Sequence, residues 1–393
     1  MGLALWGHRR KDHSPPVEER ALTSVDLPWL APPTAAGIAV SPEAALRLPT
    51  VLACIRLLAE TASTLPLKSY RRSPDGREPF DGRIARLLER PSPGNTQANL
   101  VTQVVASLAA RGNAFIGKFR GESGEVEQLA LIPASHVAVE LVGGAPVYTV
   151  SGAHGVTSHD AADIVHLKLL STDGITGLSP LGQAREALGL AAATDETASS
   201  LFRNQANPKG VLTVAGGPGE DEALENLRAG FSARHGGSRG AGRVAVLTGD
   251  VKFTAVSLSP ADAELLAQRK YSATEICRLL RVPPHLVAAA QDGASMTYSN
   301  VESEGLNFLR FSLEPYLVLL QQALSADRDL CPPAVYCEFV RDALMRPDAA
   351  TRAAVFEKAL NPVTGWMRRD EIRALENLPA EPAIPSITEE SHA

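Results

Sequence analysis

Two long helical segments that bracket a small insert constrain the fold of this 393-residue chain more than any other feature. The first begins at Ser179-Pro180, where a serine can cap the helix and a proline suits its first turn, and it ends at Asn207-Pro208. The second runs from Pro260 to residue 282. Between them, strand patterns at 210–214, 244–247 and 253–257 and a helical pattern at 220–234 predict a small β-α-β-β insert over residues 207–259.

The chain before this helix pair alternates between helical and strand patterns. Ser41-Pro42-Glu43 opens a helix whose apolar residues recur at helical spacing as far as Ala62. Short helices are expected at 83–88 and 100–111, and strands at 68–71, 114–119, 127–132, 137–142, 147–150 and 164–167. Residues 37–178 therefore predict an α+β unit, preceded by a charged, proline-bearing arm over residues 1–36 that we expect to be flexible.

The chain after the helix pair is predicted to be helical. Ser299-x-x-Glu302 is a capping box that opens a helix reaching about Leu324. Pro315 lies inside this helix and is expected to kink it, because proline has no N–H to donate. Two short helices, at 349–360 and 367–377, and a tail over 379–393 complete an α+β fold.

Composition excludes several classes of protein. The net charge of -6 argues against a simple basic nucleic-acid binder, and no stretch approaches the ~20 apolar residues of a membrane span. The cysteines show no C-x-x-C pair and no spacing suited to zinc; they are Cys54, Cys277, Cys331 and Cys337. We predict reduced thiols in a cytosolic protein, with a Cys331–Cys337 disulfide as the alternative, and no metal or cofactor.

Catalytic motifs are missing from the sequence. There is no H-E-x-x-H pair and no G-x-x-x-x-G-K-[ST] phosphate loop. The G-x-S-x-G spacing of Gly236-Gly237-Ser238-Arg239-Gly240 lies in a glycine-bearing loop without the strand–helix setting of a nucleophile elbow. A structural role is therefore favoured over catalysis. The alternative is a cytosolic α+β hydrolase-like enzyme with an unrecognised site.

Short sequence words along the chain resemble the portal proteins of HK97-like tailed bacteriophages. They begin with Thr50-Val51-Leu52-Ala53-Cys54-Ile55-Arg56, Gly112-Asn113-Ala114-Phe115 and Gly177-Leu178-Ser179-Pro180-Leu181, and continue with Asn204-Gln205-Ala206-Asn207-Pro208, Glu275-Ile276-Cys277-Arg278, Val282-Pro283-Pro284 and Leu313-Glu314-Pro315. Their common order extends over residues 40–378. It is this order, more than any single word, that carries the resemblance.

The resemblance implies a homo-oligomeric ring, usually a dodecamer, at one capsid vertex of the virion. It divides the chain into an arm (1–36), a wing (37–178 and a kinked helix, 298–330), two stem helices (179–206 and 260–282), a clip (207–259), a tunnel loop (283–297), a crown (331–378) and a tail (379–393). The implied partners are double-stranded DNA, the large terminase subunit, a head–tail adaptor and the major capsid protein, with no membrane. The particle would assemble in the host cytoplasm, and a defective prophage or gene-transfer particle is an equally open source.

The candidate DNA-facing residues come from the second stem helix and the loop after it. On a helical wheel, Leu265, Ile276, Leu279 and Leu280 fall on one face, and Lys270, Arg278 and Arg281 on the other. The basic face fits a channel wall or a subunit contact, and it fits an ordinary solvated face equally well. Residues 200–285 carry eleven Lys/Arg and eight Asp/Glu, a modest surplus of +3 that would hold DNA only weakly.

Two flexible segments complete the candidate site. Gln291, Asp292 and Ser295 lie in the predicted tunnel loop, where the resemblance favours contact with DNA over a plain surface loop. Arg234, His235, Arg239 and Arg243 form a glycine-bearing edge of the clip. This edge suits contact with the terminase or the adaptor, or alternatively is a solvated turn.

Overall fold

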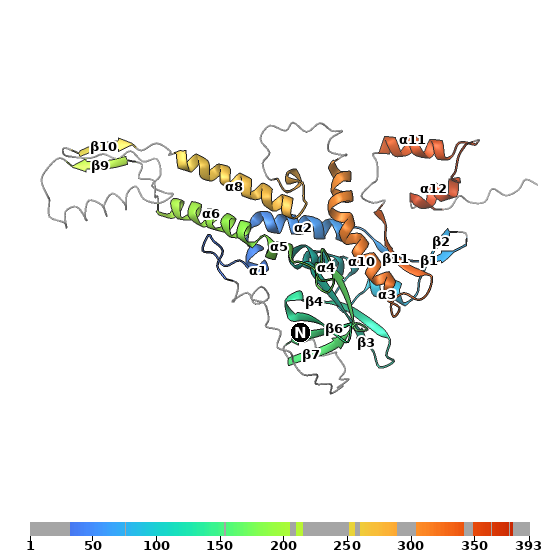
Figure 1. Cartoon of the computed structure of the whole chain (residues 1–393). Helices are drawn as coiled ribbons and strands as arrows, with labels where there is room; N and C mark the ends of the chain where they lie inside the picture. The colour runs from blue at the N-terminus through green and yellow to red at the C-terminus, as the bar shows by residue number, and fades with distance from the viewer. Residues whose placement is uncertain are drawn as a thin grey trace, which may run out of the picture. The chain divides into compact units, whose positions relative to one another are not determined.

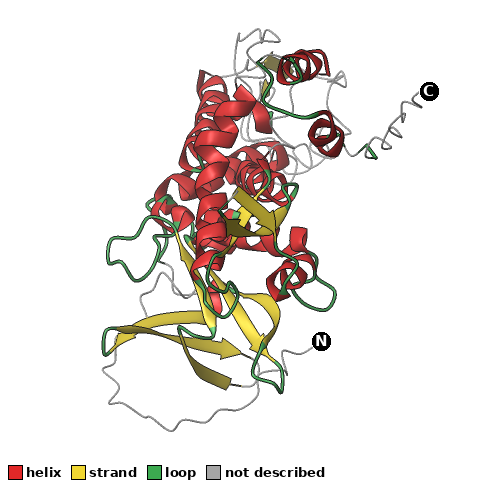
Figure 2. Cartoon of the chain, turned by 90° about the vertical axis from the view of Figure 1, so that its right-hand side faces the viewer, coloured by secondary structure: helices red, strands yellow, loops and turns green. Residues whose placement is uncertain are grey.

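The computed structural model describes residues 32–74, 76–152, 155–204, 210–214, 251–255, 260–288, 304–341, 349–362, 364–376 and 378–379 (Figure 1). The chain divides into two compact units, Met1–Phe339 and Val340–Ala393. The first unit combines helices with three three-stranded sheets and one two-stranded sheet, and Figure 2 shows helices and strands mixed in this way. The predicted α+β class is therefore confirmed.

The first unit opens with four helices, α1 (Pro42–Ala45), α2 (Pro49–Ser63), α3 (Arg83–Glu89) and α4 (Gln97–Arg111). Ser41 caps α1 as predicted, with its Oγ accepting a hydrogen bond from Ala44 N at 3.1 Å. The single helix predicted from residue 41 to Ala62 was wrong. Leu48 has extended backbone ahead of Pro49, as residues before proline prefer, so the chain breaks there and starts a second helix.

Three antiparallel sheets follow. Their strand orders are β11-β1-β2, β4-β3-β8 and β5-β6-β7. The strands are β1 (Leu67–Ser73), β2 (Gly76–Pro79), β3 (Asn113–Arg120), β4 (Val126–Ile132), β5 (Val137–Val142), β6 (Ala145–Gly152), β7 (Gly155–Asp160), β8 (Ile164–Lys168) and β11 (Val335–Phe339). The predictions missed β2 and β7, because both are short and almost wholly exposed and so lack apolar alternation.

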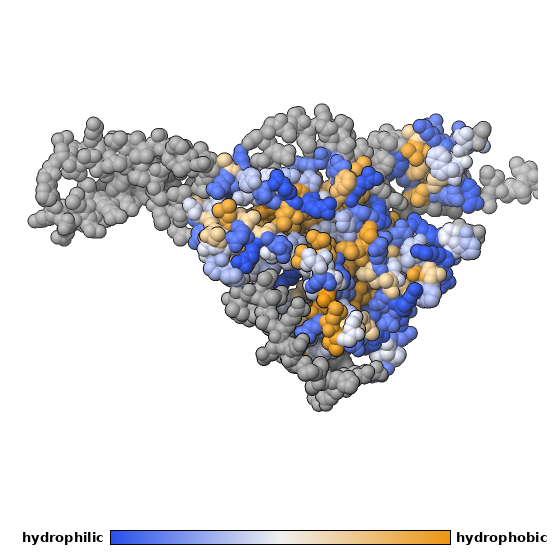
Figure 3. Space-filling model, viewed as in Figure 1, coloured by the Kyte–Doolittle hydropathy of each residue, from blue (hydrophilic) through white to orange (hydrophobic). Residues whose placement is uncertain are grey.

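The main core lies between α2, α4 and the sheet of β3. Val51, Cys54, Leu58, Val104 and Leu108 are fully buried where α2 and α4 pack together. A second, smaller cluster on the other face of β3 holds Phe115, Ile132, Tyr148 and Ile164, and it joins the sheet β5-β6-β7 to the rest of the unit. On the face of the molecule shown in Figure 3, hydrophobic residues are interspersed among hydrophilic ones.

Two predicted boundaries were displaced. Residues 331–339 do not begin the helical C-terminal part, because Val335–Phe339 forms β11 and pairs along its whole length with β1. Residues 32–36 do not belong to a flexible arm. Thr34 is buried against Gly189, and Ala35 N donates a hydrogen bond to the carboxylate of Glu186 at 2.9 Å.

The helix pair consists of α6 (Arg185–Asn204) and α8 (Pro260–Leu279), with the short α5 (Pro180–Gln183) ahead of α6. The single helix predicted from residue 179 is thus interrupted at Ala184. Between the pair, β9 (Gly210–Val214) and β10 (Val251–Ala255) form an antiparallel ribbon. Both strands were predicted, the second two residues later at 253–257, whereas their pairing was not. The predicted helix 220–234 and strand 244–247 lie outside the described residues.

The chain returns through η2 (Pro284–Val287) to a helix that contains Pro315. Residues 304–307 are helical, η3 (Phe308–Leu313) is a π-helical turn, and α10 (Glu314–Ala326) continues from it. The irregularity predicted at Pro315 therefore takes the form of a π turn just before it. Pro315 stands in the first turn of α10, where a missing N–H matters least.

The second unit contains α11 (Ala349–Ala359) and α12 (Arg369–Leu375). Arg352 Nε lies 3.1 Å from Glu376 Oε1 and ties the two helices together. Ala359 and Ile372 are the buried apolar residues of its described part.

Candidate functional site: the paired helices and their anchor

The helices α6 and α8 run antiparallel side by side, the arrangement visible in Figure 1. An ion pair links them, with Arg269 Nε 2.9 Å from Asp195 Oδ1. Neither residue is among the predicted site residues. Each helix of the predicted pair carries several charged residues, so the sequence alone did not show which acidic side chain of α6 meets which basic side chain of α8.

The last two turns of α8 have the two faces that the sequence predicted. Ile276, Cys277 and Leu280 are buried, whereas Lys270 and Arg278 are exposed, and Leu279 is half-buried. Arg278 also forms an ion pair with Glu275 one turn earlier. The side chain of Leu265 lies outside the described part.

Arg281 does not belong to this face in the way predicted. The helix ends at Leu279, and Arg281 has a φ of +57°, in the left-handed region. Val282 N then donates to Cys277 O at 2.9 Å, the helix-ending pattern in which glycine usually takes the left-handed position. The side chain of Arg281 is exposed, but because Arg281 lies beyond the end of the helix, a helical wheel does not describe the direction of that side chain.

A shallow cavity of about 290 Å³ lies where α8 meets α6 and the start of α2. It is lined by Pro49 and Thr50 from α2, Asp195 from α6, and Arg269 and Lys270 from α8. Apolar side chains of Leu48, Ala191 and Ile276 also line the cavity, so it has a largely apolar wall with both signs of charge at its edge, beside the predicted basic face.

The two candidate segments outside α8 cannot be placed. Gln291, Asp292 and Ser295 of the loop lie outside the described residues, and so do Arg234, His235, Arg239 and Arg243 of the insert. The loop is bounded by η2 on one side and by the helix from residue 304 on the other. These assignments remain predictions.

The helix pair is anchored to the body by a close crossing of two glycine-containing segments, the Gly112–Gly177 crossing. Gly112 ends α4 with a φ of +73°, and a Cβ there would lie 2.0 Å from Leu178 O. A Cβ on Gly177 would lie 2.1 Å from Gly112 O. Only glycine fits at either position, and the crossing lies immediately before α5 and α6.

The side-chain amide of Asn113 stabilises this crossing by hydrogen bonds to the backbone of Gly177. Its Oδ1 accepts from Gly177 N and its Nδ2 donates to Gly177 O, both at 2.7 Å. Ser179 adds a bond to Ala110 O at 2.9 Å while capping α5. Two of the sequence words that carry the family resemblance, around Gly112 and Gly177, thus meet in space.

His166 lies beneath the crossing and packs against aromatic rings. Its Nε2 lies 3.1 Å from Asn113 Oδ1, its ring stacks on Phe115 with centroids 4.4 Å apart, and Tyr148 meets it edge-on. Burial first, and then the charge of Lys168, lowers the pKa of His166 from 6.5 to about 4. The imidazole is therefore neutral in the folded protein at neutral pH.

We predict a specific loss of stability in mild acid from this residue. The unfolded chain takes up a proton on His166 below pH 6.5 and the folded protein only near pH 4, so stability falls as the pH decreases across this window. The loss approaches about 3 kcal/mol below pH 4. Thermal melts of the wild type and His166→Gln from pH 7 to 4 check it: the variant should have the flatter pH profile. The exposed His136→Gln is the control, and an unchanged slope in His166→Gln would refute the assignment.

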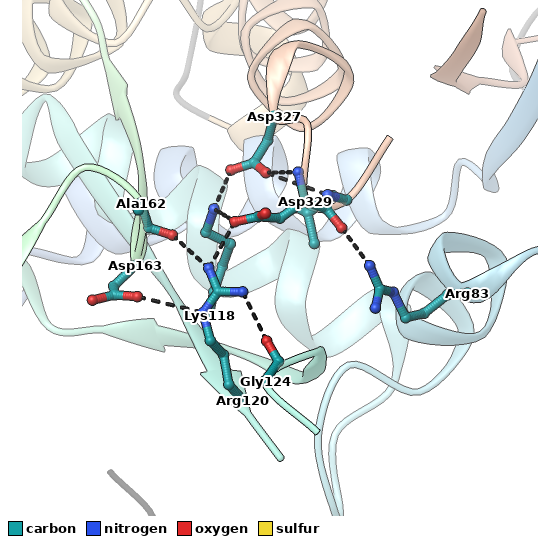
Figure 4. A network of polar contacts seen from close by, with 9 residues as sticks. Arg83, Lys118, Arg120, Gly124, Ala162, Asp163, Asp327 and Asp329 are labelled. Carbon is teal, nitrogen blue, oxygen red and sulfur yellow. Dashed lines mark hydrogen bonds and ion pairs between the residues drawn. The ribbon is translucent and has the colours of Figure 1, made fainter. Parts of the chain in front are cut away.

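A buried ion network joins β3 to the turn after α10 (Figure 4). Lys118 Nζ lies 2.6 Å from Asp327 Oδ2 and 3.1 Å from Asp329 Oδ2, and its side chain is 2% exposed. Arg120 binds Asp329 at 2.7 Å. The hydrogen bond from Arg120, ahead of those from Lys118, lowers the pKa of Asp329. No local pattern predicts this network, because the cations and carboxylates that meet in it are about 210 residues apart in the chain.

The four cysteines are free, buried and arranged in two pairs. Cys54 in α2 and Cys277 in α8 have sulfur atoms 3.9 Å apart, and those of Cys331 and Cys337 are 3.7 Å apart. The first pair is part of the contact between α8 and the body. In the described part of the chain, no group of three or more His, Cys, Asp and Glu is arranged to bind a metal, and no helix is long and apolar enough to cross a membrane.

This combination of an α+β body with a helix pair and an insert is the fold of particle-neck and portal proteins. The chain resembles a protein in the neck of an empty GTA (gene transfer agent) particle, with a TM-score of 0.64 and 24% identity over 86% of this chain and 94% of that one. It also resembles the crystal structure of an HK97 family phage portal protein from Corynebacterium diphtheriae, with a TM-score of 0.53 and 18% identity over 77% and 96% of the two chains.

The chain belongs to the phage portal protein family, whose sequence profile matches residues 49–377. It is 31% identical over 402 residues to the probable portal protein of Streptomyces phage phiC31, covering 95% of this chain and 84% of the relative. It is 28% identical over 351 residues to the portal protein of Enterobacteria phage HK97, covering 87% and 81%. The predicted resemblance is confirmed, and the relatives above support a portal protein rather than the hydrolase-like alternative.

Proposed function

We propose that this portal protein acts as a homododecameric ring at the unique vertex of a DNA-filled particle and conducts double-stranded DNA during packaging and ejection. The observation that carries the proposal is the family match over residues 49–377. The neck of a native GTA particle, computed with C12 symmetry, contains a chain of the same fold, with a TM-score of 0.61. Such a ring requires heterologous contacts, in which one face of a subunit meets a different face of the next.

Within this proposal, the α+β part of the first unit is the wing, and α6 and α8 are the stem. Residues 207–259 are the clip, 283–297 the tunnel loop, and the crown begins at Val340 rather than at residue 331, because β11 is a wing strand. The Gly112–Gly177 crossing, Cys54 and Cys277 then join the stem to the wing. This joint sets the position of the stem helices relative to the rest of the subunit.

The proposed channel surface comprises Lys270 and Arg278 on α8, with Arg281 and the tunnel-loop residues Gln291, Asp292 and Ser295. A small number of cations per subunit suits a conduit, because each further phosphate contact strengthens binding and slows translocation. The clip, with Arg234, His235, Arg239 and Arg243, is proposed to contact the large terminase subunit during packaging and the head–tail adaptor afterwards. The major capsid protein would surround the wing in the virion after assembly in the host cytoplasm, and the ring requires no cofactor.

The experiment that tests the ring is native mass spectrometry of the purified chain, followed by negative-stain imaging of the main species. We expect a ring of about a dozen copies with a central hole. A chain that stays monomeric at high concentration, and also when it is coexpressed with the capsid protein of the same particle, would contradict the proposal.

The double variant Lys270→Glu/Arg278→Glu is expected to lower DNA packaging by about tenfold or more while the mass of the ring stays unchanged. Each substitution is repeated in every subunit, so a ring of cations becomes a ring of anions facing phosphates. Packaged DNA per particle, measured by nuclease protection, checks the prediction. Arg56→Glu, which reverses an exposed arginine on α2, is the matched control. Normal packaging in the double variant would exclude this face from the channel.

A further inference from the structure

The sheet β11-β1-β2 has one buried and one open face. Along β1 and β11, Leu67, Ser69, Val335, Cys337 and Phe339 are buried on the core side. The alternate residues face outward, and the register places Tyr70 opposite Tyr336 and Arg72 opposite Arg77. No helix covers this outward face in the described structure, since Lys68, Arg72 and Arg77 are all exposed.

Arginine and tyrosine side chains form a layer over the open face. Arg77 lies over the ring of Tyr70 at 4.8 Å, and Arg72 over the ring of Tyr336 at 5.4 Å. The two tyrosine rings are themselves 6.0 Å apart. Guanidinium groups that lie flat on rings lose little further freedom when they bind, and their N–H groups at the edge stay available for a ligand.

The open face has a surplus of positive charge on a chain whose net charge is -6. Lys68, Arg72 and Arg77 stand against one carboxylate, Glu338, which Arg77 binds at 2.7 Å. Over the described ranges, neither Lys68 nor Arg72 has an ion-pair partner within 4.0 Å. In Figure 3 the region of β1 and β2 is mostly hydrophilic.

Two features favour a carboxylate-bearing polypeptide over DNA as the ligand. Strong binding to DNA requires several phosphates to be neutralised, and this face offers only two cations without a carboxylate partner. Glu338 on the edge strand β11 adds a negative charge that Arg77 already binds. The guanidinium of an arginine can donate two parallel hydrogen bonds to the two oxygens of one carboxylate. Tyrosine and arginine are also enriched among the residues that contribute most of the binding energy at protein interfaces. In addition, β2 is an exposed edge strand along which an extended segment can lie.

We propose that the open face of β11-β1-β2 is a docking surface for an acidic polypeptide segment of another protein in the particle. Its carboxylates bind Lys68 and Arg72 at the centre, while Tyr70 and Tyr336 provide the rigid platform beneath. The surface belongs to the wing and is separate from the stem and clip. It thus goes beyond the proposed DNA channel and does not depend on it.

The test uses the purified full chain and a fluorescein-labelled oligoglutamate of about twelve residues, titrated at two salt concentrations by fluorescence polarisation. The double variant Lys68→Glu/Arg72→Glu is expected to bind about tenfold more weakly, because two attractive charges become repulsive. Arg56→Glu/Arg310→Glu reverses two exposed arginines elsewhere and should stay within about twofold of the wild type. Arg72→Lys, which keeps the charge but removes the fork, should lose about threefold.

Two outcomes would overturn the proposal. The first is an equal affinity for oligoglutamate in the double variant and its control. The second is that the double variant loses as much affinity for a duplex DNA of about 25 base pairs as it loses for the peptide, which would make this a nucleic-acid surface. Melting temperatures verify that each variant is folded, and Arg72→Lys carries the test if the double variant is not. Native mass spectrometry of the same samples shows separately whether the ring forms.

Discussion

Gly112→Ala is expected to prevent stable folding, with a loss of about 4 kcal/mol or more. The substitution has two costs at one position. A left-handed φ of +73° disfavours a side chain, and the new Cβ would stand 2.0 Å from the carbonyl oxygen of Leu178, in backbone that cannot rotate away. To relieve this overlap, the Gly112–Gly177 crossing must open. Opening breaks the Asn113 bonds to Gly177 and frees the start of the helix pair.

Gly174→Ala is the matched control for this prediction. Gly174 has the same φ of +73° in a nearby loop, but no atom lies within 4 Å of the position of a Cβ. It should cost only about 1 kcal/mol, the price of the backbone conformation alone. Soluble yield and chemical unfolding of both variants separate the two effects, and equal losses would show that the close crossing contributes nothing.

Lys118→Met is expected to destabilise the first unit by about 3–5 kcal/mol. Methionine fills a similar volume, so the loss comes from charge rather than from a cavity. Asp327, whose side chain is 13% exposed, keeps its charge but loses its cation 2.6 Å away. Denaturant unfolding at neutral pH measures the effect.

Two comparisons make this second prediction specific. Arg56→Ala removes an exposed ion pair with Glu60 and should change stability by less than about 0.5 kcal/mol. The deficit of Lys118→Met should narrow as the pH falls below 3.8. Hydrogen bonds, first from Arg120 and then from Lys118, depress the pKa of Asp329 in the folded protein. The part of its stabilising contribution that depends on Lys118 is therefore present above its ordinary pKa of 3.8 and disappears as the carboxylate is protonated. A deficit of the same size at every pH would show that packing, not charge, causes it.

Local chemistry explains which parts of the fold could be predicted from sequence. The cap of α1 at Ser41, the helices α3 and α4 and most strands depend on residues a few positions apart, so their patterns are visible in the chain. The family resemblance depends on the order of short words and was equally visible. The errors fall where local signals are weak, as in the exposed β2 and β7, or where a proline inside a helical pattern can either begin or interrupt a helix, as at Pro49.

Residue patterns alone were sufficient to predict the α+β class, the helix pair around an insert, the buried and basic sides of the C-terminal part of α8, and membership of the portal family. How these parts are joined became visible only in the folded chain. Folding brought Gly112 to Gly177, Cys54 to Cys277 and Lys118 to Asp327, paired β11 with β1, and placed arginines over tyrosines on an open sheet. The reason is physical: a periodic pattern records which side of an element avoids water, whereas the partner of a buried glycine, thiol or charge is fixed by packing between segments distant in the chain.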